Sequence, residues 1–198
     1  MKKINIDNAV DDVKKLFDEW VFKSIESSYR ATSAPGGGTP MVAFMLVSCA
    51  IDVIAGFYSG RSSFIRQDIS GQYKEFVKDY MKPYNPNIVY EEIRCSLVHN
   101  FIPGKSIKLT HNNPQIDFFT QGDFQIKNFD NFFFVFQHAV NEYITDLRKP
   151  ENKDLRKKFI KRYKLGIPRV QVFNYGLSDI KDARINKYKV TIASKRKK

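Results

Sequence analysis

The sequence predicts a mainly α-helical fold with a small extended or β insertion near residues 106–127 and a basic C-terminal extension. Apolar residues recur at helical spacing along most of the chain. The chain is 42% hydrophobic and 14% aromatic, which is enough apolar surface to form a core. Residues 149–198 hold 17 Lys and Arg against 4 Asp and Glu, whereas residues 1–148 hold 16 against 17. We therefore expect a nearly neutral helical domain over residues 1–148 and a separate basic extension over residues 149–198.

Two long helices are expected in the first third of the chain. Apolar positions repeat at helical spacing over residues 7–29, with Asp7 as the expected N-cap, and again over residues 41–58. The second stretch is apolar on nearly every face, so we expect it at the centre of the bundle. Asp52 interrupts this stretch, which favours a core helix over a membrane span. Residues 31–40 predict a flexible linker around Pro35-Gly-Gly-Gly38, because these residues cannot hold a helix and the lysine of a phosphate-binding loop does not follow them.

The rest of the chain divides into further helices and short strands. Helices are expected over residues 71–82, 87–100, 128–148 and 154–165. In the helix over 87–100, Val89, Ile93 and Leu97 form one apolar stripe. Short alternating stretches separated by Asn, Pro and Gly predict strands over residues 107–110, 115–119 and 124–126. The helix over residues 128–148 is heavily aromatic on one side, so we expect it to be the second anchor of the core. The pattern over residues 166–198 indicates no particular fold.

One of these helices carries an arginine and a histidine separated by four residues, Arg94-Cys-Ser-Leu-Val-His99. This spacing resembles the defining motif of the HEPN superfamily (higher eukaryotes and prokaryotes nucleotide-binding domain), which is Arg, four to six residues, then His. The order of helices over residues 7–148 is also similar to that of HEPN proteins. Many members are metal-independent ribonucleases, so the resemblance implies a HEPN-like helical bundle with Arg94 and His99 as a catalytic pair. It also implies a homodimer in which two copies of the motif face each other.

The two side chains suit the cleavage of RNA without a metal ion or another cofactor. An imidazole takes or gives a proton near neutral pH, and a guanidinium stabilises the charge that builds on a phosphorane. In a regular α-helix, however, positions five residues apart lie roughly 140° apart around the axis. We therefore expect that one chain does not bring Arg94 and His99 together, and that the arginine of one subunit approaches the histidine of its twin.

Three further residues flank the motif pair, namely Cys95, Ser96 and Asn100. Many HEPN proteins have Asn directly after the arginine, where this chain has Cys95. Toxins of the superfamily that are paired with nucleotidyltransferase antitoxins have Tyr two residues after the histidine. This chain has Phe101 there, and a phenyl ring has no hydroxyl to modify. We therefore expect no regulation by nucleotide attachment at this position.

A second candidate site lies in the helix expected over residues 154–165. Six basic residues there surround apolar ones in an amphipathic pattern: Arg156, Lys157, Lys158, Lys161, Arg162 and Lys164. We expect them to bind the phosphate backbone of RNA, with an anionic membrane surface and a merely solvated face as the alternatives. Aromatic residues among the lysines and a second basic cluster at residues 195–198 favour nucleic acid, and no membrane partner is expected.

The other residues of catalytic or metal-binding type form no cluster in the sequence. Cys49 and Cys95 lie in separate apolar helical patterns, so neither a disulfide framework nor a zinc site is indicated, and we expect a reducing compartment. His111 and His138 are expected at the surface, and no metal site is predicted. Acidic residues near the N-terminus precede any apolar run of signal-peptide length, which favours a cytoplasmic location.

The sequence supports three hypotheses about function. The first is a HEPN-like dimer of toxin or defence type, which binds RNA through its basic extension, cleaves it at Arg94 and His99, and has an antitoxin or another regulatory protein as a partner. The second is a non-catalytic HEPN-like binding or regulatory module. The third is a structural helical protein without a nucleic-acid role. Cleavage of RNA in the presence of a chelator separates the first hypothesis from the other two.

Overall fold

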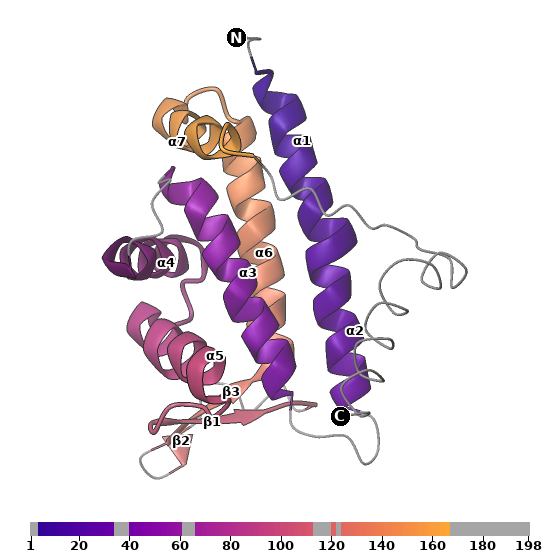
Figure 1. Cartoon of the computed structure of the whole chain (residues 1–198), viewed down its shortest axis with the longest axis vertical. Coiled ribbons are helices and arrows are strands. Elements are labelled where there is room, and N and C mark those ends of the chain that lie inside the picture. Colours follow the sequence, from indigo (N-terminus) through magenta and orange to yellow (C-terminus); the bar gives the residue numbers. More distant parts are fainter. Residues whose placement is uncertain (1–3, 34–39, 61–65, 113–119, 122–123, 167–198) are drawn as a thin grey trace, which may run out of the picture. The chain divides into compact units, whose positions relative to one another are not determined.

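Helices form most of the structure, which confirms the prediction of a mainly α-helical fold (Figure 1). The computed structural model describes residues 4–33, 40–60, 66–112, 120–121 and 124–166. All of them fall within one unit of the chain, Met1–Ile167. Three features expected from the sequence lie outside the described residues: the linker at 35–38, the strand at 115–119 and the basic cluster at 195–198.

The first helix is continuous but contains one π-helical turn. It consists of α1 (Ile6–Leu16), η1 (Phe17–Val21) and α2 (Phe22–Ser33), so the helix expected over residues 7–29 is confirmed. The helix continues to Ser33, so the predicted start of the linker at residue 31 is wrong. The expected N-cap is wrong by two residues, because the side chain of Asn5 accepts a hydrogen bond from the amide of Asp7 at 2.9 Å. Asp7 instead lies in the first turn, where a negative charge favours the helix dipole.

The central helix is α3 (Met41–Ser59), as the sequence predicts. Helical elements contact it on several sides: α2, α4 (Arg66–Tyr80), η2 (Ile88–Cys95), α5 (Ser96–Asn100), α6 (Phe129–Arg148) and α7 (Lys153–Tyr163). The sequence predicted that α4 starts at Gly71, but the helix begins five residues earlier, at Arg66. Gly71 does not prevent this, because one glycine inside a helix costs only about 1 kcal/mol relative to alanine.

Aromatic side chains fill the space between α3 and α6, so α6 is the second anchor of the core. The rings of Phe44 and Phe132 stack with their centroids 5.4 Å apart. Further along, Tyr143 is completely buried, and its ring meets the edges of Tyr80 and Tyr58 at 5.6 Å and 6.1 Å. These edge-to-face contacts add to the stabilisation that burial itself provides.

A small sheet precedes α6. Strand β1 (Ile107–Thr110) pairs in parallel with β3 (Phe124–Asn128), and β2 (Thr120–Gln121) pairs antiparallel with β3, giving the order β1-β3-β2. The side chain of Asn128 then accepts hydrogen bonds from two amides in the first turn of α6. Because the last residue of β3 is also the N-cap of α6, the sheet is fixed at the N-terminal end of that helix.

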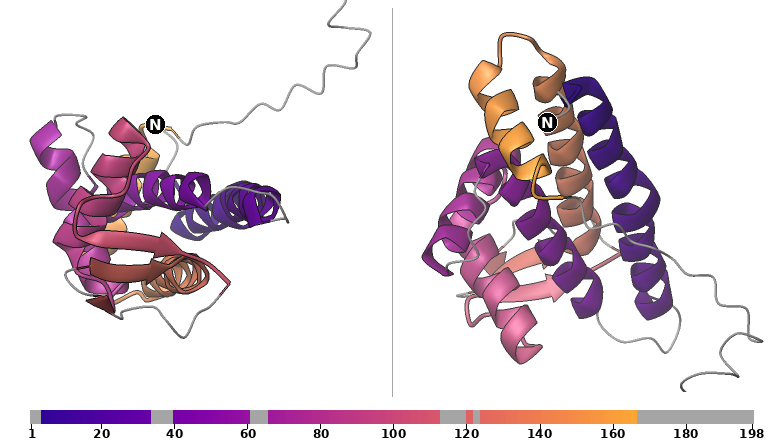
Figure 2. Two further views of the ribbon diagram at one scale, coloured as in Figure 1. Left: turned by 90° about the horizontal axis from the view of Figure 1, so that it is seen from below. Right: turned by 45° about the horizontal axis from the view of Figure 1, so that its top comes forward.

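Helix α7 packs against α3 and α1 (Figure 2). Phe159 is completely buried, with its ring 5.6 Å from that of Phe57. Gly60 ends α3 with a φ of 65°, and a Cβ there would lie 2.7 Å from the Cα of Lys158. Glycine therefore allows the end of α3 to approach the backbone of α7 closely. The first helix of the expected basic extension thus packs in the same unit as residues 1–148.

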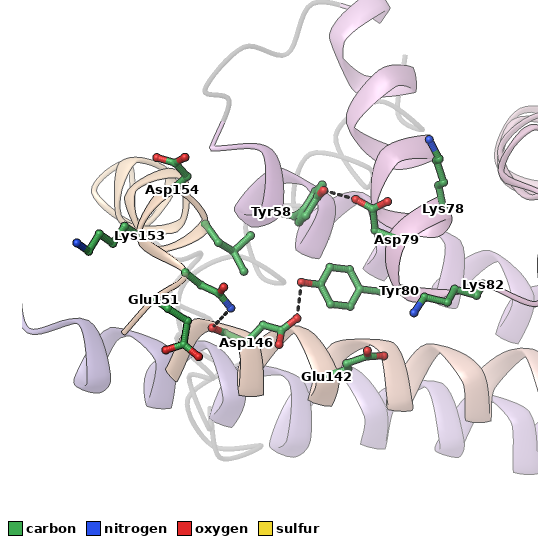
Figure 3. A pocket seen from close by; sticks show the side chains of 12 residues that line it. Tyr58, Lys78, Asp79, Tyr80, Lys82, Glu142, Asp146, Glu151, Lys153 and Asp154 are labelled. Atoms are coloured by element: carbon green, nitrogen blue, oxygen red, sulfur yellow. Dashed lines mark hydrogen bonds between the residues drawn. The ribbon is translucent and has the colours of Figure 1, made fainter. Parts of the chain in front are cut away.

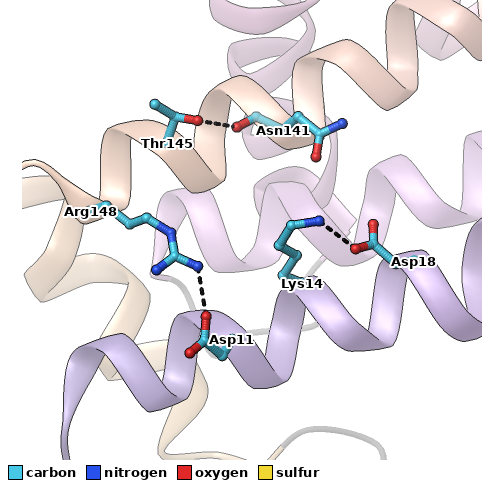
Figure 4. Close-up of polar contacts among 6 residues, drawn as sticks. All are labelled: Asp11, Lys14, Asp18, Asn141, Thr145 and Arg148. Carbon is cyan, nitrogen blue, oxygen red and sulfur yellow. Dashed lines mark hydrogen bonds and ion pairs between the residues drawn. The ribbon is translucent and has the colours of Figure 1, made fainter.

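Ion pairs at the surface also join the helices. Arg148 Nη2 lies 2.6 Å from Asp11 Oδ1 and links the end of α6 to α1 (Figure 4). Lys14 of α1 pairs with Asp18 of η1, one turn further along the same continuous helix. Both side chains of the Arg148–Asp11 pair are well exposed, at 45% and 61%. Exposed ion pairs contribute at most about 1 kcal/mol each to the stability of the fold. The Arg148–Asp11 pair is therefore a suitable control for ion pairs that are shielded from solvent.

Candidate functional site

The motif residues lie on a helix made of two parts, η2 and α5. Val89, Ile93 and Leu97 are completely buried and form the apolar stripe that the sequence predicts for this helix. The stripe packs the motif helix against α3. Arg94 and His99 therefore lie beside the buried stripe, with His99 exposed in the last turn.

The two motif side chains meet within one chain, with Arg94 Nη1 3.5 Å from His99 Nε2. The expectation that a single chain keeps them apart is wrong, because it considered only the backbone positions and the long side chain of Arg94 reaches the imidazole. Arg94 lies near the end of the π-helical segment Ile88–Cys95, and His99 lies in the α-helical segment that follows.

Helix α3 supplies the partner of Arg94. Arg94 Nε donates a hydrogen bond to Asp52 Oδ2 at 3.1 Å, and the guanidinium carbon lies 5.6 Å from the centroid of the Tyr90 ring. The side chains of Arg94 and Asp52 are only 18% and 24% exposed. The site therefore presents a shielded, fixed cation next to the accessible imidazole of His99.

Burial and charge oppose each other at the Asp52–Arg94 pair. Burial acts to lower the pKa of Arg94, but the charge and hydrogen bond of Asp52 outweigh it and raise this pKa. The pKa of Asp52 is raised, because burial outweighs the nearby charge of Arg94. Burial and the charge of Asp52 also raise the pKa of the Cys49 thiol. Arg94 is thus a permanent cation, and Asp52 is a carboxylate in a poorly solvated place.

The three residues expected to flank the motif have different surroundings. Cys95 is half-buried, with its Sγ 3.9 Å from Arg94 Nη1. Ser96 Oγ donates a hydrogen bond to the carbonyl of Glu91 at 3.0 Å, so the motif helix itself uses this hydroxyl. Asn100 is exposed at the end of α5. Of the three, Cys95 is the one whose side chain meets the guanidinium.

Sequence reasoning missed the contact made by Asp52 and treated this residue only as an interruption of an apolar stretch. The sequence does contain one indication of such a contact, because Asp52 is the only charged residue in α3. Its partner could not be predicted from the sequence, since Arg94 is 42 residues away and belongs to another helix. A buried charge needs a partner, however, and the motif arginine was a reasonable candidate.

The remaining histidines are His111 and His138. The ring of His111 packs edge-on against Tyr29 at 6.1 Å, and its Nδ1 is buried. His111 is half-buried, so the expectation of a surface position holds for it only in part. It is confirmed for His138, whose side chain is 70% exposed, with Nδ1 3.9 Å from Glu142. Within the described ranges, no group of three or more His, Cys, Asp or Glu side chains could hold a metal ion.

Helix α7 presents a lysine face to solvent. Four of the six basic residues expected to bind RNA are exposed: Lys157, Lys158, Lys161 and Lys164. Arg156 and Arg162 are half-buried. The guanidinium carbon of Arg162 lies 5.9 Å from the centroid of the Phe57 ring on α3. Lys158 Nζ lies 5.8 Å from the centroid of the Tyr58 ring. Lys157, Lys161 and Lys164 are therefore available to a ligand, whereas Arg162 and Lys158 help to pack α7 on the bundle.

A cavity of about 880 Å³ lies among α4, α6 and α7, and no motif residue lines it (Figure 3). Tyr80 donates a hydrogen bond to Asp146 at 3.0 Å, and Tyr58 donates one to Asp79. Carboxylates outnumber lysines among the lining residues. This balance of charge does not suit the binding of phosphates, so the cavity is not part of the candidate RNA site.

In the part of the chain that the structure describes, α3 is the one helix long and apolar enough to cross a membrane. The rest of the protein buries 56% of its most apolar stretch. A buried core helix passes the same test of length and composition, so this is weak evidence for a membrane span.

The chain has no match among family models, curated proteins or solved structures. The candidate site therefore stands on its own geometry. That geometry is a shielded Asp52–Arg94 pair at 3.1 Å with the exposed His99 at 3.5 Å from the same guanidinium.

Proposed function

We propose that this protein is a HEPN-like ribonuclease that cleaves RNA without a metal ion. One observation carries the proposal: Arg94 Nη1 lies 3.5 Å from Nε2 of the exposed His99. Asp52 and Tyr90 hold the guanidinium from the protein side. A proton-transfer group and a fixed cation, the two groups that such cleavage needs, are therefore present at one place. The spacing of the two residues, which resembles the HEPN motif, supports the same activity.

In the proposed reaction, the 2′-hydroxyl of the substrate attacks the adjacent phosphorus. His99 takes the proton from this hydroxyl, and the guanidinium of Arg94 stabilises the negative charge on the phosphorane oxygens. The bond between phosphorus and the 5′-oxygen then breaks, the leaving oxygen takes a proton from water, and His99 returns its own proton to the solvent. The products are a 2′,3′-cyclic phosphate and a 5′-hydroxyl. No metal ion or other cofactor has a role in this scheme.

Three exposed lysines of α7 form the proposed RNA-binding surface. Lys157, Lys161 and Lys164 offer positive charge to a phosphate backbone without a fixed geometry. Such contacts carry little sequence information, so they would set affinity rather than base preference. Their contribution should weaken as the salt concentration rises.

Two further parts of the proposal come from the resemblance to HEPN proteins alone. One is a homodimer, and the other is a cytoplasmic toxin or defence role with an antitoxin or another regulatory protein as a partner. Because Arg94 and His99 meet in one chain, such a dimer would contain two complete sites rather than two shared ones.

The Asp52–Arg94 pair itself favours a second candidate function. An arginine whose Nε is bound to a carboxylate already has a structural partner. The motif would then serve only to hold the helices of a non-catalytic HEPN-like binding or regulatory module. This alternative predicts RNA binding without cleavage.

Incubation of the purified protein with mixed RNA in EDTA separates the two functions. The wild-type protein should cleave RNA, and Arg94→Ala or His99→Ala should reduce the rate by about 10²- to 10⁴-fold. Arg148→Ala is the matched control, because it removes an arginine from an exposed Arg–Asp pair outside the motif helix, and its rate should be unchanged. If the wild-type protein leaves RNA intact, or if the motif variants cleave as fast as it does, the ribonuclease proposal is rejected.

A further inference from the structure

Asp52 holds an unusual place in the bundle. It is the only charged residue in α3, and its side chain is 24% exposed. A carboxylate in such a place costs free energy unless a cation or hydrogen bonds compensate. Oδ2 accepts the hydrogen bond from Arg94 Nε, while Oδ1 is buried and has no hydrogen-bond partner among the described residues. The central helix therefore carries one carboxylate, and it binds the motif arginine.

The hydrogen bond to Asp52 is donated by Nε of the guanidinium, and this position determines how the bond orients the group. A guanidinium is planar and has donors in a fixed fork geometry. A hydrogen bond at Nε therefore fixes the direction in which the terminal nitrogens point. Nη1 lies 3.5 Å from His99 Nε2, and the Tyr90 ring covers the group at 5.6 Å. Asp52 thus binds the guanidinium at Nε, while Nη1 of the same guanidinium faces the imidazole of His99.

We infer that Asp52 is a positioning residue of the proposed ribonuclease site. By binding Nε, it keeps the terminal nitrogens of Arg94 beside His99, where the phosphate to be cleaved would bind. Asp52 would act through Arg94 and would not touch the substrate. This inference rests on the proposed function and adds a third residue, from another helix, to the motif pair.

A second ion pair on the same helix separates positioning from simple stabilisation. Lys74 Nζ lies 2.8 Å from Glu91 Oε1 and joins α4 to η2. This pair ties the motif helix to a neighbour, as Asp52 does, but Glu91 is 61% exposed and its partner is not a motif residue. If ion pairs only hold the motif helix in place, Glu91→Gln and Asp52→Asn should have similar effects on activity. If Asp52 orients Arg94, only its replacement should slow the reaction.

Asp52→Asn is the direct test, because it removes the charge and keeps nearly the same shape. We expect kcat to fall by about 10- to 100-fold while KM changes little, since a misdirected guanidinium weakens the transition state more than substrate binding. Glu91→Gln should keep the kcat of the wild-type protein. Asp11→Asn, which breaks the exposed pair with Arg148, should also keep it. Thermal unfolding must confirm that each variant is folded at the assay temperature.

A double-mutant cycle shows whether Asp52 acts through Arg94. In the Arg94→Ala background, Asp52→Asn should cause no further loss, because the group that it positions is absent. An unchanged kcat in folded Asp52→Asn, or an equal loss in both backgrounds, would overturn the inference while leaving the proposed function intact. A wild-type protein without ribonuclease activity would remove the proposed function and this inference with it.

Discussion

Two arginines reach the central helix α3 one turn apart, and their surroundings differ. Arg94 comes from η2 and donates through Nε to Asp52. Arg162 comes from α7 and lies against Gly56, where an added Cβ would be 3.3 Å from its Nε. Its guanidinium also lies 5.9 Å from the ring of Phe57. One arginine is held by a carboxylate and faces an imidazole, whereas the other packs against a glycine and an aromatic ring.

This difference separates the most basic segment of the chain from the candidate cleavage site. Helix α7 lies in the basic part of the chain, yet it is docked through Phe159 and Arg162 and exposes mainly lysines. The geometry suited to cleavage is found at Arg94, in the part of the sequence with almost no net charge. We therefore expect changes in α7 to alter stability and RNA affinity, and changes at the motif to alter the rate of cleavage.

The largest expected effect on stability is at the docking residue of α7. Phe159→Ala removes a completely buried ring and should lower the free energy of unfolding by about 3–5 kcal/mol, through lost burial and the cavity left behind. Urea unfolding followed by circular dichroism measures this loss. Lys157→Ala, an exposed position on the same helix, should stay within about 0.5 kcal/mol of the wild-type value. A loss below about 1 kcal/mol for Phe159→Ala would mean that α7 is not docked as described.

The next effect concerns the shape of the motif cation. Arg94→Lys keeps the charge but loses the planar fork, so one group can no longer bind Asp52 and face His99 at once. We expect kcat for RNA cleavage to fall by about 100-fold. Arg148→Lys makes the same exchange in the exposed Arg–Asp pair and should not change kcat. Equal kcat values for Arg94→Lys and the wild-type protein would show that charge alone is sufficient at this position.

A smaller effect is expected for the lysine face of α7. Replacement of Lys157, Lys161 and Lys164 by alanine should weaken RNA binding and lower the salt dependence of the affinity by a slope of about 2, as expected for three lost contacts to single-stranded RNA. RNA with 2′-O-methyl groups is the suitable ligand, because it lacks the attacking hydroxyl. If affinity and slope stay at the wild-type values, the face is only solvated and RNA binds elsewhere.

The smallest expected effect is on the pH dependence of stability. Burial raises the pKa of Asp52 above its ordinary value of 3.8. When the pKa of a group is higher in the folded protein than in the unfolded chain, the group stabilises the fold at a pH below both pKa values. This stabilisation is lost as the pH rises through the pKa of the group in the folded protein. The stability of the wild-type protein relative to Asp52→Asn should therefore fall as the pH rises above the ordinary aspartate pKa and through the raised pKa of folded Asp52. Thermal unfolding of both proteins checks the sign, and a difference that grows with pH would mean that Arg94 outweighs burial.

The sequence predicted the fold where apolar periodicity determines it. The stripe of Val89, Ile93 and Leu97 is buried as expected, and the expected central helix is the one that most elements contact. The exact helix starts were less predictable, because capping depends on local side-chain geometry, as at Asn5. The parallel pairing of β1 with β3 was not predicted, since it joins segments that are distant in the chain.

The candidate site was predictable in its residues but not in its geometry. The spacing of Arg94 and His99 suggested the pair, but it does not reveal in which direction the long side chain of Arg94 points. That direction brings Arg94 Nη1 within 3.5 Å of His99 Nε2. The contact with Asp52 was also hidden, because it depends on how the motif helix packs against α3.

If Arg94 and His99 of the same chain form the site, two inactive variants that are mixed cannot restore each other's activity. Arg94→Ala and His99→Ala are unfolded together, refolded at equal concentrations and assayed with RNA in EDTA, beside wild-type protein treated in the same way. We expect no more activity than the two variants have separately, because no mixed assembly contains an intact pair in one chain. Recovery of up to about a quarter of the wild-type rate, as expected for sites shared across a two-fold axis, would contradict the account.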